Sequence, residues 1–389
     1  QEIQELLGRV APRGTWCSLR IVETHNESYT VRDDALLPPR STTDRGAMIT
    51  VVSGNGQGIA ATCDLSPGGL YQAARVALDW AHAASDQGVV DFSKAPRPQR
   101  SGTWSHPVEK PWEESTPKEI VDRLRSSCLS MAGDERVVQR VASLSRSCSE
   151  TTLVTTDEVV IKQKHDRIIP WLQVLASDGS DVQTRTNGGR SDAQLGGLEV
   201  LDKVNFDGLG SQIREDALET LLAPICPSGI MDAVIGPAQM VLQVHESIGH
   251  ALELDRILGD ERNYAGTSFV KTEDLGSLRW GPEILDVVID PGVEGEVCST
   301  GFDDEGLEAE KVSLIDKGRL VRGIGGSLSA QRLDMEDEAI AVTRACSWNR
   351  PPIDRMANLN IEPGKTPMKD LIGGVENGIW LDVNSSWSI

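Results

Sequence analysis

Short, mainly apolar runs separated by polar turn residues predict strands joined by tight turns near the start of the chain. Residues 48–52 and 59–62 are such runs, and the segment between them includes Ser53-Gly54-Asn55-Gly56, which has the residues of a hairpin turn. Ser66 and Pro67 then predict the N-cap and first turn of a helix reaching about Ala84, because small apolar residues recur there at helical spacing. Residues 1–93 are therefore interpreted as an N-terminal α+β domain.

A change in composition separates this first block from a second one. Five prolines fall between Lys94 and Pro117, so residues 94–116 are predicted to form an extended linker. Thr116 and Glu119 have the spacing of a capping box and predict a helix reaching about Met131. Four antiparallel strands are predicted at residues 137–144, 150–155, 158–165 and 168–176, and a helix is predicted at 211–223. Together they define a middle domain over residues 117–225.

The third block, residues 228–389, combines one long amphipathic helix with short apolar runs. A strand at 231–235 leads into Gly236-Pro237, which marks the start of the helix. Its predicted apolar face consists of Ala238, Val241, Leu242, Ile248 and Leu252. Short strands are predicted at 285–289, 311–314, 320–324 and 358–361. The expected fold is α+β, with a small N-terminal mixed domain and a larger, mainly antiparallel C-terminal domain that carries the helix.

The candidate chemistry lies on that helix, in His245-Glu246-Ser247-Ile248-Gly249-His250. The chain has six histidines, and two of them flank this glutamate closely. Imidazole is a common metal ligand, and a neighbouring carboxylate is suited to take a proton from an activated water. Residues five apart turn through about 500° on a regular helix, which leaves them about 140° out of line. A π-bulge would bring both rings to one face, and Gly249 would ease it because it adds no side chain and tolerates unusual dihedrals.

The motif alone also fits two unrelated histidines on one helix, because the pattern is short and its spacing unusual. Further segments change that balance. Residues 245–256 resemble the signature of the TldD/PmbA family, and residues 301–306 resemble its acidic "DDEG" segment. Residues 312–318, 351–358 and 361–364 are similar to later family segments, and residues 44–46 with the following hairpin are similar to its opening domain. These motifs occur in the family's order over nearly the whole chain.

The resemblance implies a TldD-type zinc metallopeptidase, with His245 and His250 as zinc ligands and Glu246 as general base. The PmbA branch, also called TldE, lacks these three residues, which this chain keeps. Glu253 belongs to the same motif and is interpreted either as a carboxylate that orients a ligand or as a solvated helix residue. The acidic residues 303–305 either line the cleft or form a plain polar loop, and the loop is the favoured interpretation.

The family's third zinc ligand is a cysteine in a segment beyond the stretch that resembles Ser385–Ile389, where this sequence ends. A catalytic zinc has three protein ligands and a water. None of the seven cysteines matches the family position. Cys298 and Cys346 lie in the right domain, but free cysteine is most often a small buried hydrophobe. The third ligand is therefore left open, and the sequence, which begins at Gln1, is expected to be truncated.

Charge and cysteine usage restrict the partners. The balance of 38 basic and 59 acidic residues gives −21, which argues against a nucleic-acid surface. Scattered cysteines favour the reducing cytoplasm, and no apolar run is long enough for a membrane span. The resemblance implies a homodimer, or a heterodimer with a PmbA/TldE-like subunit, that takes extended peptides through backbone contacts.

Two interpretations of the function stay open at this point, with a third that is weaker. The chain is either a peptidase, in general peptide turnover or leader-peptide trimming, or a non-catalytic subunit that binds peptides or a partner protein. A purely structural metal is the weakest alternative, because such zinc sites usually have four protein ligands and no adjacent base.

Overall fold

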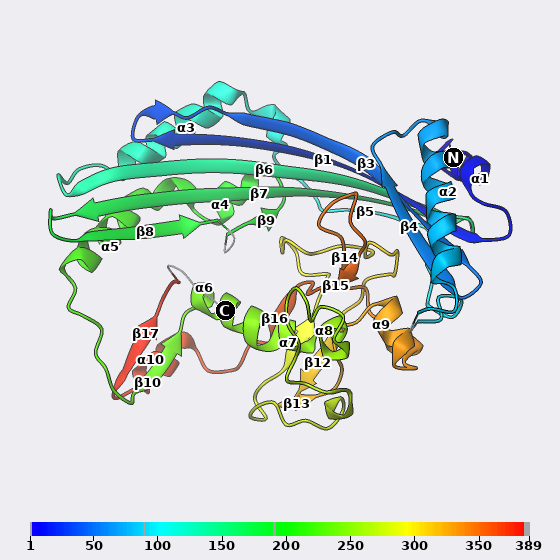
Figure 1. Cartoon of the computed structure of the whole chain (residues 1–389). Helices are drawn as coiled ribbons and strands as arrows, with labels where there is room; N and C mark the ends of the chain where they lie inside the picture. Colours follow the sequence, from blue (N-terminus) through cyan, green and yellow to red (C-terminus); the bar gives the residue numbers. More distant parts are fainter. Residues whose placement is uncertain (1, 89, 190–191, 385–389) are drawn as a thin grey trace.

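The computed structural model describes residues 2–88, 90–189 and 192–384. The stretch Ser385–Ile389, beyond which the family's third zinc ligand is expected, lies outside the described residues. The fold is α+β with mostly antiparallel sheets, as predicted. Long strands from the first half of the chain arch over a more irregular C-terminal part (Figure 1). The predicted domain boundaries remain predictions, since one sheet is shared by the first two blocks.

That sheet has nine strands, with a main path in the order β4-β3-β1-β6-β7-β5. Its neighbours are antiparallel except β5, which runs parallel to β7. The short strands β2, β8 and β9 pair outside this path. The bounds are β1 Trp16–Arg32, β2 Ala35–Leu36, β3 Arg40–Ser53, β4 Gly56–Thr62, β5 Gly102–Ser105, β6 Val137–Thr155, β7 Val160–Ser177, β8 Val182–Gly188 and β9 Gln194–Leu195.

Two very long strands, β6 and β7, replace the four that were predicted. The prediction was wrong because the polar stretches within them, such as Ser145–Ser149 of β6, look like loops. In the structure Ser145–Ser149 of β6 alternates between buried and half-buried positions. Ser149 and Thr151 of β6 and Gln163, His165 and Arg167 of β7 line a cavity. The largest sheet of the molecule is thus built by the N-terminal and middle blocks together.

Local signals predicted helices α2 and α3 and the first hairpin correctly. β3 and β4 pair through the predicted turn, with Ser53 opposite Gly56. Helix α2 (Pro67–Ala84) begins after Ser66, whose side chain accepts from the Gly69 N–H. Helix α3 (Pro117–Ser130) has the complete capping box of Thr116 and Glu119. The proline-rich segment 94–116 contributes edge strand β5 and a 3-10 turn, Trp112–Glu114.

The three larger of four hydrophobic clusters in the described residues hold these elements together. Helices α1 (Glu2–Val10) and α2 pack on one end of the sheet, around Leu19, Ile49 and Leu70. Helices α3, α4 (Glu199–Lys203) and α5 (Gly210–Leu222) share a second core with β6 and β7. The third core belongs to the C-terminal part and includes Ile248 and Leu252 of the histidine-bearing helix. That helix is therefore anchored through its second half.

The C-terminal part has small sheets and short helices. One sheet has the order β13-β12-β11-β16, β10 pairs in parallel with β17, and β14 pairs with β15. The strands are β10 Asp232–Ile235, β11 Val287–Ile289, β12 Val312–Asp316, β13 Arg319–Leu320, β14 Thr343–Arg344, β15 Ile353–Asp354, β16 Leu359–Ile361 and β17 Gly378–Leu381. The helices are α6 Pro237–Val244, α7 His250–Leu252, α8 Leu254–Leu258, α9 Ser327–Arg332 and α10 Met368–Gly373, with a π-helical turn at His245–Gly249.

Within the described ranges, no helix combines the length and the apolar character needed to cross a membrane.

Candidate metal centre

The π-helical turn between α6 and α7 sets the geometry of the histidine pair. The His250 N–H donates to the His245 carbonyl, so one turn closes over five residues, as the spacing predicted. The two imidazole rings lie edge to face with centroids 4.5 Å apart. One ligand atom from each of His245, Glu246 and His250 lies within 4.8 Å of the others. A residue spacing that a regular α-helix would separate is therefore brought to one face.

Gly249 is needed for its missing side chain, which is one of the two reasons expected for it. Its backbone is ordinary right-handed helix, with φ −56° and ψ −64°, so no unusual dihedral requires glycine there. A Cβ at this position would overlap Sδ of Met356, which is itself buried. The glycine therefore allows the π turn to pack closely against the segment that carries Met356.

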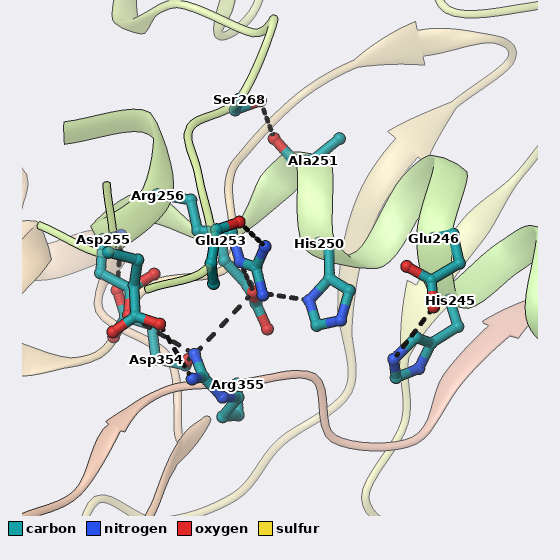
Figure 2. A network of polar contacts seen from close by, with 12 residues as sticks. His245, Glu246, His250, Ala251, Glu253, Asp255, Arg256, Ser268, Asp354 and Arg355 are labelled. Atoms are coloured by element: carbon teal, nitrogen blue, oxygen red, sulfur yellow. Dashed lines mark hydrogen bonds and ion pairs between the residues drawn. The ribbon is translucent and has the colours of Figure 1, made fainter. Parts of the chain in front are cut away.

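Glu253 fixes the orientation of His250 (Figure 2). Its carboxylate is fully buried, and Oε2 lies 2.8 Å from His250 Nδ1 and 2.7 Å from Arg256 Nε. Because a carboxylate only accepts, His250 Nδ1 donates and its Nε2 keeps a lone pair. The interpretation of Glu253 as a solvated helix residue is therefore wrong.

His245 is the more open member of the pair. Its side chain is 47% exposed, against 21% for His250, and Nε2 lies 4.0 Å from Glu246 Oε1. Partial burial lowers the pKa of His245, and the neighbouring His250 lowers it further. Both effects favour the neutral imidazole, which is the form that binds a metal.

Behind the histidines lies a buried network of acidic residues and arginines (Figure 2). Asp255 and Asp354 are both buried, and the Asp255 N–H donates to Asp354 Oδ2 at 3.2 Å. Arg355 lies 3.7 Å from Asp255 and 3.1 Å from Glu261. Burial raises the pKa of Asp255 from 3.8 to about 8, and the charges of Asp354 and Glu253 add to this effect. The Asp255 carboxyl group is therefore protonated at neutral pH in the folded protein.

Asp255→Asn is expected to flatten the pH dependence of stability. In the unfolded chain Asp255 ionises near its ordinary pKa of 3.8, whereas the folded protein keeps the proton until about pH 8. Between these values the folded state binds more protons, so its stability falls as pH rises. Asparagine cannot ionise, so the variant should gain at least about 1 kcal/mol over the parent at pH 8 relative to pH 4.5.

Urea unfolding at these two pH values measures that difference. The exposed Asp79→Asn on α2 is the matched control and should follow the parent. A parallel pH dependence in parent and Asp255→Asn would show that Asp255 ionises normally in the fold.

His245 opens onto a cavity of ≈ 680 Å³ between the sheet and the C-terminal part. Its lining includes His245, Cys298 and Cys346. Neither cysteine joins the group formed by the two histidines and Glu246 in the part of the chain that the structure describes. A third ligand from Cys298 or Cys346 is therefore not supported by this geometry.

The acidic segment 303–305 does more than form a polar loop. Asp303 and Asp304 both line the cavity, and Asp304 lies 3.1 Å from Arg20 Nη1. Asp303 is buried and accepts from the Thr343 hydroxyl at 2.7 Å. The favoured interpretation was wrong because the partners, Arg20 and Thr343, are far away in sequence.

Sequence reasoning missed the basic residues of this cavity, Arg167 and Arg344. His165 also lines it, between Gln163 and Arg167 on one face of β7. Burial lowers the pKa of His165 to about 3, so it stays neutral. Residues 162–167 are all polar, so no alternation in the sequence would have singled out Gln163, His165 and Arg167 before the strand was known.

Comparisons with known proteins find relatives across most of the chain. A family profile described as "PmbA/TldA metallopeptidase C-terminal domain" matches residues 228–386, and "PmbA/TldA metallopeptidase domain 1" matches residues 17–84. A metalloprotease of Synechocystis is 27% identical over 97% of this chain and 78% of its own length. A metalloprotease of Methanothermobacter thermautotrophicus is 29% identical over 64% of this chain, a match that spans about half (52%) of that protein.

Solved structures share the fold at low sequence identity. TldE from Thermococcus kodakarensis superposes with a TM-score of 0.75 at 15% identity, covering 99% of this chain and 82% of its own. A Thermotoga maritima protein named as a modulator of a DNA gyrase also has a TM-score of 0.75, at 17% identity, with coverages of 95% and 78%. Profiles, relatives and fold agree, and the chain belongs to the PmbA/TldD family of metallopeptidases.

Proposed function

We propose that this protein is a zinc-dependent peptidase that hydrolyses unfolded or extended peptides, in general peptide turnover or in leader-peptide trimming. The observation that carries the proposal is the grouping of His245, Glu246 and His250 beside a large cavity. The family and its metalloprotease relatives support peptide hydrolysis as the reaction class. The cytoplasmic location stays a prediction.

The donor set fits zinc. His245 and His250 supply two nitrogen ligands on one face, and Glu253 holds His250 in the tautomer that leaves Nε2 free. The adjacent Glu246 argues against a purely structural metal. A bound zinc ion supplies a Lewis acid that polarises the water and the peptide carbonyl.

Glu246 is the proposed general base. Its side chain is 25% exposed, so it is accessible to a water or a peptide beside the histidines. The carboxylate would accept a proton from the attacking water and return it to the leaving nitrogen. His245, on the cavity side, would hold the reacting centre next to the bound peptide.

A partner subunit is proposed from the uncovered apolar surface near the site. Helix α6 has no buried residue, which differs from the predicted apolar contact of Ala238, Val241 and Leu242. Val241 is 55% exposed. Further exposed apolar side chains in the same region are Leu371, Ile372, Trp380, Leu381 and Val383. Such a surface is typical of an interface, and we propose a second copy of this chain or a PmbA/TldE-like subunit as its partner.

The test combines elemental mass spectrometry with a peptide hydrolysis assay. We expect about one zinc per chain, as a single catalytic site requires. We also expect hydrolysis of an unfolded peptide that a chelator abolishes and added zinc restores. Hydrolysis that survives complete removal of the metal would contradict the proposal.

The second candidate is a non-catalytic subunit that binds peptides or a partner protein. A catalytic zinc has three protein ligands, whereas the described part of the chain offers two histidines, of which His245 is 47% exposed. This difference favours the second candidate. Peptide binding without turnover, unchanged by the chelator, would support this alternative.

A further inference from the structure

Three arginines from distant parts of the sequence line the cavity beside His245. They are Arg20 on β1, Arg167 on β7 and Arg344 on β14. Arg20 is neutralised by Asp304 at 3.1 Å. Arg167 and Arg344 form no ion pair with any carboxylate of the residues that the structure describes. In a chain with a net charge of −21, two unpaired guanidiniums in one cavity require an explanation.

Both guanidiniums keep donors for a ligand. Arg167 Nε donates to the Val297 carbonyl at 3.0 Å, and Arg344 Nη1 donates to Cys298 Sγ at 3.1 Å. A guanidinium has five N–H donors, so most of them have no partner in these two contacts. Burial lowers the pKa of Arg167. Cys298, Asp304 and Asp166 oppose this effect, while the charge of Arg344 adds to it, so the two positive charges lie close enough to repel.

The backbone that carries Arg344 is fixed on both sides. The Thr343 N–H and hydroxyl donate to Asp303 at 3.2 and 2.7 Å. The Ala345 N–H donates to Asp304 at 2.8 Å. Arg344 itself is exposed, so its side chain is reachable from the cavity. Because the backbone is already ordered, binding a ligand there costs little additional conformational entropy.

A carboxylate is the ligand that this pair fits. The planar fork of arginine matches the two carboxylate oxygens, and an anion would balance two positive charges that otherwise repel in a half-enclosed space. We propose that Arg167 and Arg344 form a carboxylate-binding subsite of the peptide cavity. Its ligand is the C-terminal carboxylate of the peptide or an acidic side chain near the cleaved bond. The inference rests on the proposed function, since His245 lines the same cavity.

The test measures peptide binding without turnover, using fluorescence anisotropy on the Glu246→Gln protein. Three dye-labelled hexapeptides of neutral sequence are compared: one with a free C-terminal carboxylate, one with a C-terminal amide, and one amide that contains a single glutamate. We expect a carboxylate to tighten binding about 10-fold or more over the plain amide, as a charge-assisted contact would.

Two variants and a control locate the effect. Arg344→Gln and Arg167→Gln, each in the Glu246→Gln background, should bring the affinity of the carboxylate peptide close to that of the amide. Arg125→Gln removes an exposed arginine on α3, a helix that packs with the core on the other face of the sheet, and should keep the full preference. Circular dichroism on each variant checks folding, and the comparison of the three peptides in the parent needs no arginine variant.

The outcomes separate the sources and the hypotheses. Tight binding of the free-carboxylate peptide alone assigns the subsite to the peptide C-terminus, whereas tight binding of the glutamate amide assigns it to a side chain. Equal affinities for all three peptides would overturn the subsite and leave the proposed peptidase standing. A preference that persists in both arginine variants would also overturn it. No measurable binding of any peptide would overturn the subsite and the proposed function together.

Discussion

Glu246→Gln is expected to abolish peptide hydrolysis while leaving the bound metal in place. Glutamine keeps the size of the side chain but cannot accept a proton from water at neutral pH. The two imidazoles that would hold the metal come from His245 and His250, and the orientation of His250 depends on Glu253 rather than on Glu246. Because loss of a general acid–base group typically costs about 10²–10⁴-fold in rate, we expect kcat to fall by that factor.

The experiment measures kcat for an unfolded peptide together with the zinc content of the same preparation. Glu219→Gln, which changes an exposed glutamate on α5, is the matched control and should retain the parental rate. Retained hydrolysis in Glu246→Gln with normal zinc content would remove Glu246 from the role of base. Loss of both zinc and hydrolysis would instead place Glu246 among the ligands.

The local part of this site was predictable from the sequence because its geometry is set within a few residues. The five-residue spacing of His245 and His250 requires a π turn if both rings are to face one metal, and the structure contains that turn. The caps of α2 and α3 followed from Ser66 and Thr116 for the same reason. The contact that excludes a side chain at Gly249 was not predictable, because it is made by Met356.

The remainder of the site is made by contacts between residues far apart in sequence. Asp303 and Asp304 resemble a polar loop until Thr343, Ala345 and Arg20 are brought to them. The length of β6 and β7 was also hidden, because the polar residues of their cavity-facing side look like loop residues when the cavity is unknown. The cavity forms only when the sheet packs against the C-terminal part, because its lining comes from both. The charged residues that line it could therefore not be identified from local sequence patterns.

Glu253→Gln is expected to weaken zinc binding by about 10- to 100-fold, the usual cost of losing the group that orients a histidine ligand. The buried carboxylate fixes the tautomer of His250 and makes its free nitrogen more basic. Glutamine would keep an acceptor oxygen but remove the charge that faces both His250 and Arg256. Thermal stability should fall as well, because removing one partner leaves a nearly buried arginine uncompensated.

The loss of stability is the reason for a matched control. Glu261→Gln also removes a carboxylate that is paired with a buried-network arginine, because Arg355 Nη2 lies 3.1 Å from Glu261 Oε2. Glu261 does not contact His250, whose Nδ1 donates to Glu253. Competition titration of zinc against a chelating dye should therefore show weaker binding in Glu253→Gln and parental binding in Glu261→Gln, although both unfold at lower temperature. Equal zinc affinities in the two variants would mean that Glu253 stabilises the fold without tuning His250. The difference in zinc affinity between these two variants thus reports the effect of the Glu253 charge on His250.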